Sequence, residues 1–204
     1  EEVDLANLSE EAMIQTEAEP MTAVVFCRGL KRLFIQFFHA MRDKNVSIST
    51  ISYAIHSMAI LGFDEVFAFW ALRSRAEGGV AFGTSDIGLT HAIAGGASLA
   101  LHLFAYSHLD RLLGSLLILQ ISCMVMAPAL ALMPVTAQLP TQSIGQWLLI
   151  IGLMQVKAIA ATAGWAASNL LISNAAPTAL VGAVNGMSAS VAAVARVFGP
   201  IMAG

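Results

Sequence analysis

Long apolar stretches separated by short polar segments make up most of the chain after its first 45 residues. Four of them cover about residues 46–72, 86–106, 112–135 and 144–172, and a fifth begins near Leu180. A helix needs about 20 apolar residues to cross a hydrocarbon core of roughly 30 Å. The connecting segments contain Gly, Pro and charged residues, which are typical of turns. The pattern therefore predicts five transmembrane helices.

The composition favours a membrane protein over a soluble one. Hydrophobic residues make up 57% of the chain and charged residues 11%, against roughly 45–50% and 25% in an ordinary soluble domain. A buried soluble helical bundle would need a polar face on most of its helices, and these stretches lack one. The predicted fold class is an all-α membrane protein. We expect an integral, multi-pass protein, and the sequence does not distinguish a plasma membrane from a vacuolar one.

Residues 1–45 hold most of the charged side chains and form a separate segment. Residues 1–20 are acidic and poor in aromatic residues, as in a disordered tether. Residues 26–44 mix basic side chains with Leu, Phe and Met at helical spacing, which predicts an amphipathic basic helix. That helix lies either in the membrane interface or in the cytosol, packed against the protein. The excess of Lys and Arg before the first stretch places this segment in the cytosol.

Five spans carry the chain from the cytosol to the far side of the membrane. The sequence also starts with Glu-Glu rather than Met and has no pattern of a signal peptide. We therefore expect a fragment of a longer protein, with at least one further helix.

Ionisable residues inside the predicted helices are the main candidates for function. Each charge at mid-membrane costs roughly 2.5–3.5 kcal/mol, so such residues usually face a partner or a wet cavity. From the helical rise, Asp64 lies about 25 Å and Arg196 about 24 Å from the cytosolic starts of their helices. We therefore expect Asp64 or Glu65 to pair with Arg196. Such a pair serves either structure or transport, and the sequence leaves both open.

Lys157 lies near the membrane centre, roughly 18 Å from the outer start of its helix. Ala161, Gly164 and Ser168 share its helix face. A cation beside small residues predicts a cavity wall, where Lys157 would contact a substrate or a counter-ion. The alternative is a second buried ion pair.

His91 shares a helix face with Gly95, Ser98 and His102. The two histidines lie roughly 16 Å apart along the helix, so they cannot share one metal ion. His91 is a candidate for proton relay or hydrogen bonding in a cavity. No cluster of His, Cys, Asp and Glu has the spacing of metal ligands, so the sequence predicts neither a metal site nor a cofactor.

Five segments carry a resemblance to a known family. In chain order they are GFDEVFAFWA, GGVAFGTSDIG, LDRLLG, SNAAPTALVGAVNG and ARVFGPIMAG. Their order resembles the C-terminal half of a major facilitator superfamily transporter, in the drug:proton antiporter-like branch that includes zinc-induced facilitator-like proteins. Asp110 and Arg111 look like a degenerate copy of the family's cytosolic loop motif. Arg196, Gly199 and Pro200 are similar to the Arg-x-x-Gly-Pro signature of the branch.

The resemblance implies that residues 46–204 are helices 7 to 11 of a twelve-helix transporter and that residues 1–45 belong to its central cytosolic loop. The N-terminal six-helix half and the last helix would then lie outside this sequence. Folds of this kind rock two halves around a site near the midplane. The resemblance gives Asp110, Arg111, Arg196, Gly199 and Pro200 structural or gating roles.

The predicted function is secondary active transport of small organic solutes or drug-like compounds by alternating access, coupled to protons. Asp64, Glu65, His91 and Lys157 are the candidates for substrate binding or proton coupling. The expected partners are the lipid bilayer, the missing half, a small-molecule substrate and protons, with no nucleic acid. An enzyme is not predicted, because no HExxH, GxSxG or paired Asp motif appears. The alternative is a transport-inactive scaffold or receptor derived from the same fold.

Overall fold

The computed structural model describes residue 35 and residues 37–203. The predicted acidic tether and residues 26–34 of the predicted basic helix lie outside the described residues. Close to α3, Phe37 and Ala40 are buried while Phe38 is exposed. Ala40 belongs to the same apolar cluster as Val46 and Val184, so this end of the chain packs against the helical bundle.

Five long apolar helices make up the described part of the chain, as the hydrophobic pattern predicted. They are α3 (Lys44–Leu72), α4 (Thr84–Ala100) continued by α5 (Tyr106–Leu113), α6 (Ser115–Leu132), α7 (Ile144–Ala175) and α8 (Val181–Ala203). Short 3-10 turns, η1 (Arg75–Glu77), η3 (Met133–Gln138) and η4 (Thr178–Leu180), lie between them. Each long helix is apolar and long enough to cross a membrane. The protein is therefore an integral, multi-pass membrane protein.

The second helix is longer than the hydrophobic pattern predicted. A π-helical turn, η2 (Leu101–Ala105), joins α4 to α5, and the helix continues to Leu113 through the polar segment SHLDR that we expected to be a loop. His108, Asp110 and Arg111 are tolerated there because they lie at the end of the span, away from its apolar middle. The chain reverses only at Gly114, whose φ of +76° favours glycine. Here the expected boundary was wrong.

Helix ends are set by local hydrogen bonds. The Asp43 side chain accepts a hydrogen bond of 2.8 Å from the Asn45 amide at the start of α3. The Ser143 hydroxyl accepts one of 3.2 Å from the Gln146 amide at the start of α7. Such caps satisfy backbone donors that the first helical turn leaves free.

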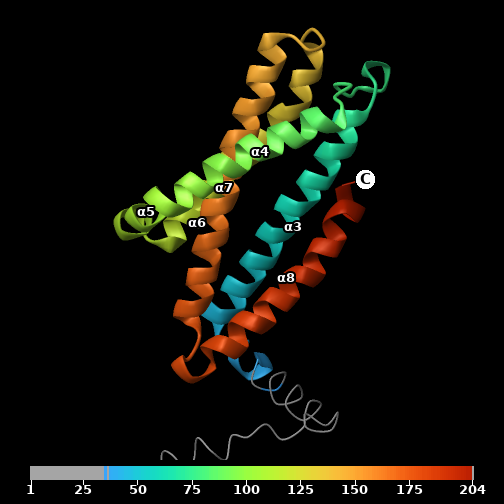
Figure 1. Cartoon of the computed structure of the whole chain (residues 1–204). Helices are drawn as coiled ribbons and strands as arrows, with labels where there is room; N and C mark the ends of the chain where they lie inside the picture. Colours follow the sequence, from blue (N-terminus) through green and yellow to red (C-terminus); the bar gives the residue numbers. More distant parts are fainter. Residues whose placement is uncertain (1–34, 36, 204) are drawn as a thin grey trace, which may run out of the picture.

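The helices pack as two closely contacting pairs. α3 and α8 run side by side in the same direction, and α6 lies along α7 (Figure 1). α4 contacts α7 far more than it contacts α3 and crosses the bundle obliquely (Figure 1). Much of the outer surface is apolar, with Leu103, Phe104 and Met124 among the most exposed side chains. In a bilayer these side chains face lipid.

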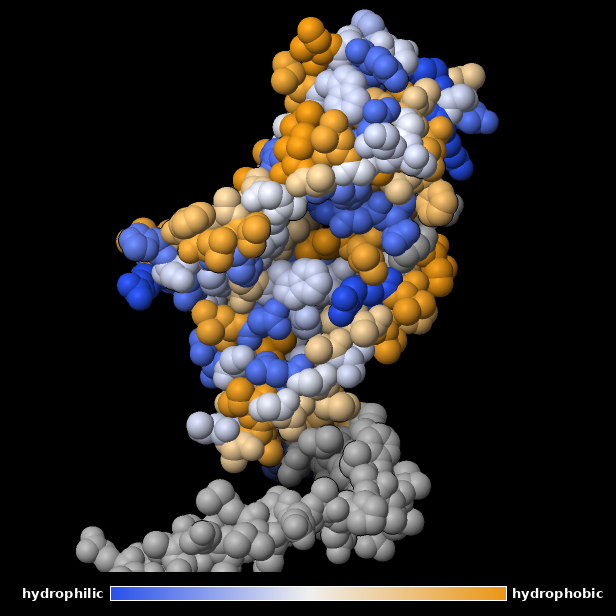
Figure 2. Space-filling model, viewed as in Figure 1, coloured by the Kyte–Doolittle hydropathy of each residue, from blue (hydrophilic) through white to orange (hydrophobic). Residues whose placement is uncertain are grey.

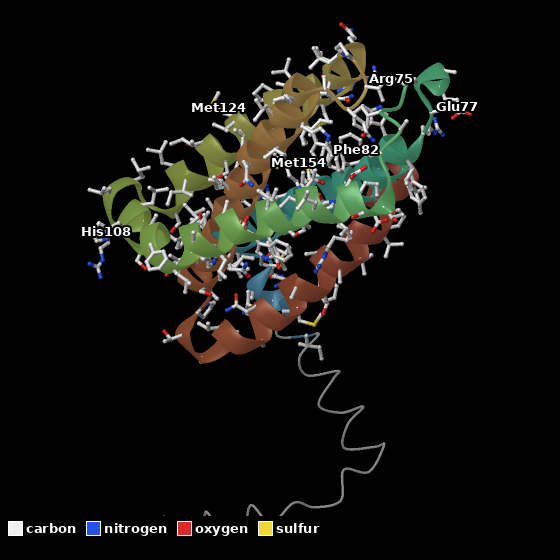
Figure 3. The ribbon with its side chains drawn as sticks, turned by 45° about the horizontal axis from the view of Figure 1, so that its top comes forward. Arg75, Glu77, Phe82, His108, Met124 and Met154 are labelled. Atoms are coloured by element: carbon white, nitrogen blue, oxygen red, sulfur yellow. The ribbon has the colours of Figure 1, made fainter. Side chains whose placement is uncertain are left out.

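The end of the bundle beyond α3 is fastened by the loop 73–83. The Arg75 guanidinium donates hydrogen bonds to the carbonyl oxygens of Ala137 and Leu139. The Phe82 ring stacks on the Trp147 ring with their centroids 4.7 Å apart. Arg75 and Phe82 both lie at this end of the molecule (Figure 3). The loop thus ties α3 to the ends of α6 and α7.

Candidate substrate cavity

Lys157 and Asp64 form an ion pair between α7 and α3. The Lys157 Nζ lies 2.5 Å from the Asp64 Oδ1, and the two side chains are 6% and 28% exposed. Lys157 also lies 5.5 Å from the centroid of the Phe63 ring. The expected pairing of Asp64 with Arg196 is wrong, and the alternative that placed Lys157 in a buried ion pair is the one observed.

The direction of each side chain around α3 explains this difference. Gly62 contacts Gly199 on α8, so that side of α3 faces α8. Asp64 follows two residues later, a rotation of about 200° around the helix, and therefore points to the opposite side. α7 lies there and supplies Lys157. Matching depth alone did not identify the neighbouring helix.

The ion pair opens onto a cavity of about 230 Å³ between α3, α4 and α7. The cavity brings together three residues selected from the sequence, namely Asp64, His91 and Lys157. Ser98 and Thr162 add hydroxyl groups to its wall, and the other lining residues are mostly small or apolar. The cavity therefore has an ionic centre, two hydroxyl groups, an imidazole and apolar sides.

A second hollow of about 510 Å³ adjoins the first. Thr162 and Trp165 line both hollows, and His102 and Asn169 line only the second. Figure 2 shows hydrophilic surface in the hollowed middle of this face, flanked by hydrophobic surface. A polar route thus follows α4 and α7 away from the ion pair.

Arg196 reaches the cavity wall through Trp165. The Arg196 Cζ lies 5.6 Å from the centroid of the Trp165 ring, a cation–π contact between α8 and α7. The Arg196 Nε donates a hydrogen bond of 3.2 Å to the Ala192 carbonyl oxygen on its own helix. Among residues 37–203, no carboxylate lies within 4.0 Å of this guanidinium. Arg196 therefore lies beside Trp165 but outside the residues that line the two hollows, and it is not in an ion pair of the described chain.

Trp165 lines the cavity but was not among the residues predicted to do so. Its position was detectable, since residues 157, 161 and 165 are spaced four apart and share one helix face. Of the small residues named beside Lys157, Ala161 lines the cavity. Gly164 instead accommodates the His56 ring, because a Cβ there would lie 2.6 Å from the His56 Nε2.

The remaining candidate residues lie away from the cavity. Glu65 is exposed on α3 and does not line either hollow. Asp110 accepts a hydrogen bond of 2.6 Å from the Ser115 hydroxyl across the turn between α5 and α6, and Arg111 is exposed beside it. Gly199 and Pro200 lie in α8, which stays helical through both, and Gly199 lies against Gly62 and the Met58 carbonyl oxygen of α3.

Within residue 35 and residues 37–203, no group of three His, Cys, Asp or Glu side chains is arranged to hold a metal ion. The His56 Nδ1 lies 3.9 Å from the Cys123 Sγ, but this pair is part of the packing between α3 and α6.

Several known proteins, two of them with the word transporter in their names, share sequence similarity with this chain. It is 27% identical over 160 residues to the "probable peptide/nitrate transporter" of Arabidopsis thaliana. The aligned residues make up 78% of this chain and 33% of that protein. It is 27% identical over 156 residues to the protein ZINC INDUCED FACILITATOR-LIKE 1 of the same plant, covering 76% and 32%. It is 26% identical over 174 residues to the major facilitator superfamily multidrug transporter mfsB of Aspergillus fumigatus, covering 79% and 28%.

The chain spans about a third of the length of these relatives. No family model matches it. No solved structure matches it either. Two of these relatives carry the names of transporters, a third is a zinc-induced facilitator-like protein, and the resemblance that the sequence motifs indicated is confirmed. The chain is thus a distant homologue of a portion of the major facilitator superfamily transporters.

Proposed function

We propose that this chain forms part of a proton-coupled secondary transporter that moves a small organic solute by alternating access. The observation that supports this proposal is the Asp64–Lys157 ion pair, which is open to a polar cavity inside a bundle of membrane-spanning helices. Intramembrane charges usually mark substrate or ion pathways. The names of the relatives favour transport over catalysis or a scaffold role.

The ion pair offers a simple way to couple a proton to a change of state. While both groups are charged, each neutralises the other and the pair holds α3 against α7. A proton on the Asp64 carboxylate removes this attraction and leaves Lys157 available to another ligand. A proton or a substrate that binds one arrangement better than the other shifts the balance between them. His91 is the candidate to pass the proton, because its ring lines the same cavity.

The weak contact between α3 and α4 suits such movement. α4 packs mainly against α7 and makes few contacts with α3. The cavity therefore lies between two helices, α3 and α4, that can move relative to each other. We assign residues 46–204 to helices 7 to 11 of a twelve-helix transporter, in which the rest of the full-length protein supplies the facing half of the cavity. Rocking of one half against the other would open the cavity alternately to the two sides.

The experiment uses the full-length protein in proteoliposomes with an imposed pH gradient. Uptake of a panel of organic compounds is measured for the wild type, Asp64→Asn, Lys157→Ala and Glu65→Gln. We expect gradient-dependent uptake of at least one compound and its loss in the Asp64 and Lys157 variants. Glu65→Gln is the matched control, because it removes the adjacent carboxylate, which lies outside the cavity. Absence of uptake by a folded protein would instead favour a transport-inactive scaffold or receptor.

A further inference from the structure

Positively charged side chains outnumber carboxylates in and next to the cavity. Lys157 and Arg196 contribute two positive charges, and Asp64 is the one carboxylate that lines either described hollow. Asp64 is already neutralised by Lys157. His91 and His102 also line the hollows and carry no negative charge. Arg196 therefore adds a positive charge next to the cavity wall that no carboxylate of the described chain pairs with.

Arg196 is held in a way that leaves donors available. Its Nε donates a hydrogen bond to the Ala192 carbonyl oxygen, and its Cζ lies over the Trp165 ring. A guanidinium has five N–H donors in a fixed fork. No carboxylate of the described chain lies within 4.0 Å of its two terminal nitrogens. A fork of this kind matches a carboxylate or phosphate in a two-point hydrogen bond.

Trp165 adds an apolar surface next to this donor fork. Its ring lines both hollows, and it packs edge to face against the Tyr53 ring with their centroids 6.4 Å apart. An aromatic wall with a few placed polar groups is the usual composition of a small-molecule site. A ligand that satisfies both features has an anionic group and a flat apolar body.

We infer that the substrate is a small organic anion, whose anionic group binds Arg196 and whose apolar part lies against Trp165. This inference rests on the proposed transport function, because a bound anion is a substrate only if the protein transports it. The Asp64–Lys157 pair lies in the adjoining hollow, and Thr162 borders both. An anion that enters at Arg196 can then compete with Asp64 for Lys157, so binding of the substrate and protonation of Asp64 both break the same ion pair.

Three probes of nearly equal shape test the charge preference, namely benzoate, benzamide and benzamidinium. Their binding to the purified full-length protein is measured by calorimetry in detergent. We expect benzoate to bind about tenfold or more tightly than the other two, the difference expected for a charge-assisted hydrogen bond. Arg196→Gln should reduce benzoate affinity to that of benzamide, while Arg73→Gln, which removes an exposed positive charge outside the cavity, should leave it unchanged.

Three results would overturn the inference: tighter binding of benzamidinium, no binding of any probe, or benzoate binding that Arg196→Gln does not change. The last result would mean that an acidic residue elsewhere in the full-length protein neutralises Arg196. Trp165→Phe should retain benzoate binding and Trp165→Ala should weaken it, which tests the apolar wall without changing charge. Gradient-driven uptake of a neutral or cationic compound, with no benzoate binding, would contradict this inference and leave the proposed transport function intact.

Discussion

Gly62 on α3 and Gly199 on α8 meet backbone to backbone where the two helices cross. A Cβ on Gly199 would lie 2.8 Å from the Met58 carbonyl oxygen, and a Cβ on Gly62 would lie 3.0 Å from the Gly199 carbonyl carbon. Small residues allow this approach, which lets the backbones of membrane helices pack closely. At the other end of the same interface, the Thr50 and Ser188 hydroxyl groups are 2.9 Å apart in a buried hydrogen bond.

Gly199→Ala should destabilise the protein. The added methyl group meets the Met58 carbonyl, which is backbone and cannot move aside cheaply, so α3 and α8 must separate. Overpacking of this kind costs about 1–3 kcal/mol. Gly186→Ala is the matched control in α8, because a Cβ there meets no atom within 4 Å. Thermal unfolding of both variants in detergent measures the difference, and equal melting temperatures would contradict the close crossing.

Removing Asp64 should destabilise the protein more than removing Lys157, its partner in the ion pair. Asp64→Leu leaves Lys157, which is 6% exposed, as an unpaired buried cation, whereas Lys157→Met leaves Asp64, which is 28% exposed and reaches the cavity. Removing one partner of a buried pair costs up to about 3–5 kcal/mol, and less where water reaches the remaining charge. We expect Asp64→Leu to be the more destabilising change.

A double-mutant cycle measures the coupling between Asp64 and Lys157. The variant that combines Asp64→Leu with Lys157→Met should be more stable than Asp64→Leu alone, because it leaves no unpaired charge. The free energy of unfolding of the four proteins gives the coupling between the two residues. Additive effects of the two substitutions would show that the pair does not act as a unit.

The sequence predicted the helices better than their contacts, for a physical reason. Hydrophobicity is a local property, so five spans could be located from composition alone. The end of α5 was missed because the polar segment SHLDR has the composition of a loop, although it lies where a helix can leave the membrane. The partner of Asp64 was missed because pairing depends on which helix faces each side of α3. That information is carried by Gly62, whose contact with α8 turns Asp64 toward Lys157.

The ionisable residues of the cavity could be predicted from the sequence. Lys157 and His91 were selected because charged and ionisable groups are costly in a membrane. Trp165 carries no such cost, and its place at the wall follows from the arrangement of α7 against α4 and α8.

The His56 ring occupies the space that Gly164 leaves in α7. A Cβ on Gly164 would lie 2.6 Å from the His56 Nε2 and 3.0 Å from the Ser122 Cβ. Gly164→Ala should therefore displace His56 and break its 3.3 Å hydrogen bond with the Ala161 carbonyl oxygen. We expect a loss of about 1–3 kcal/mol, measured as a lower melting temperature.

Two variants make this test specific. Gly152→Ala in the same helix meets no atom within 4 Å and should be neutral or slightly stabilising. His56→Ala combined with Gly164→Ala should lose less than the sum of the two single changes, because the smaller side chain leaves room for the new methyl group. Additive losses would contradict direct contact between the two residues.

Arg75 should fix the end of the bundle beyond α3. Its guanidinium bonds to the carbonyl oxygens of Ala137 and Leu139, which follow α6. Hydrogen bonds that involve a charged group contribute about 1.5–3 kcal/mol each when buried, and less at a partly buried site such as this one. Arg75→Gln should therefore loosen the segment 133–142. Faster amide hydrogen exchange in that segment would be the sign of this change.

The control for Arg75 is Arg73→Gln, which removes the same charge from an exposed position two residues away. If net charge at this end mattered more than the hydrogen bonds, the two variants would exchange equally fast. We expect only Arg75→Gln to raise the exchange rate. Arg75→Lys separates the two effects further, since an ammonium keeps the charge but lacks the planar fork that spans two carbonyl oxygens. It should behave more like Arg75→Gln than like the wild type.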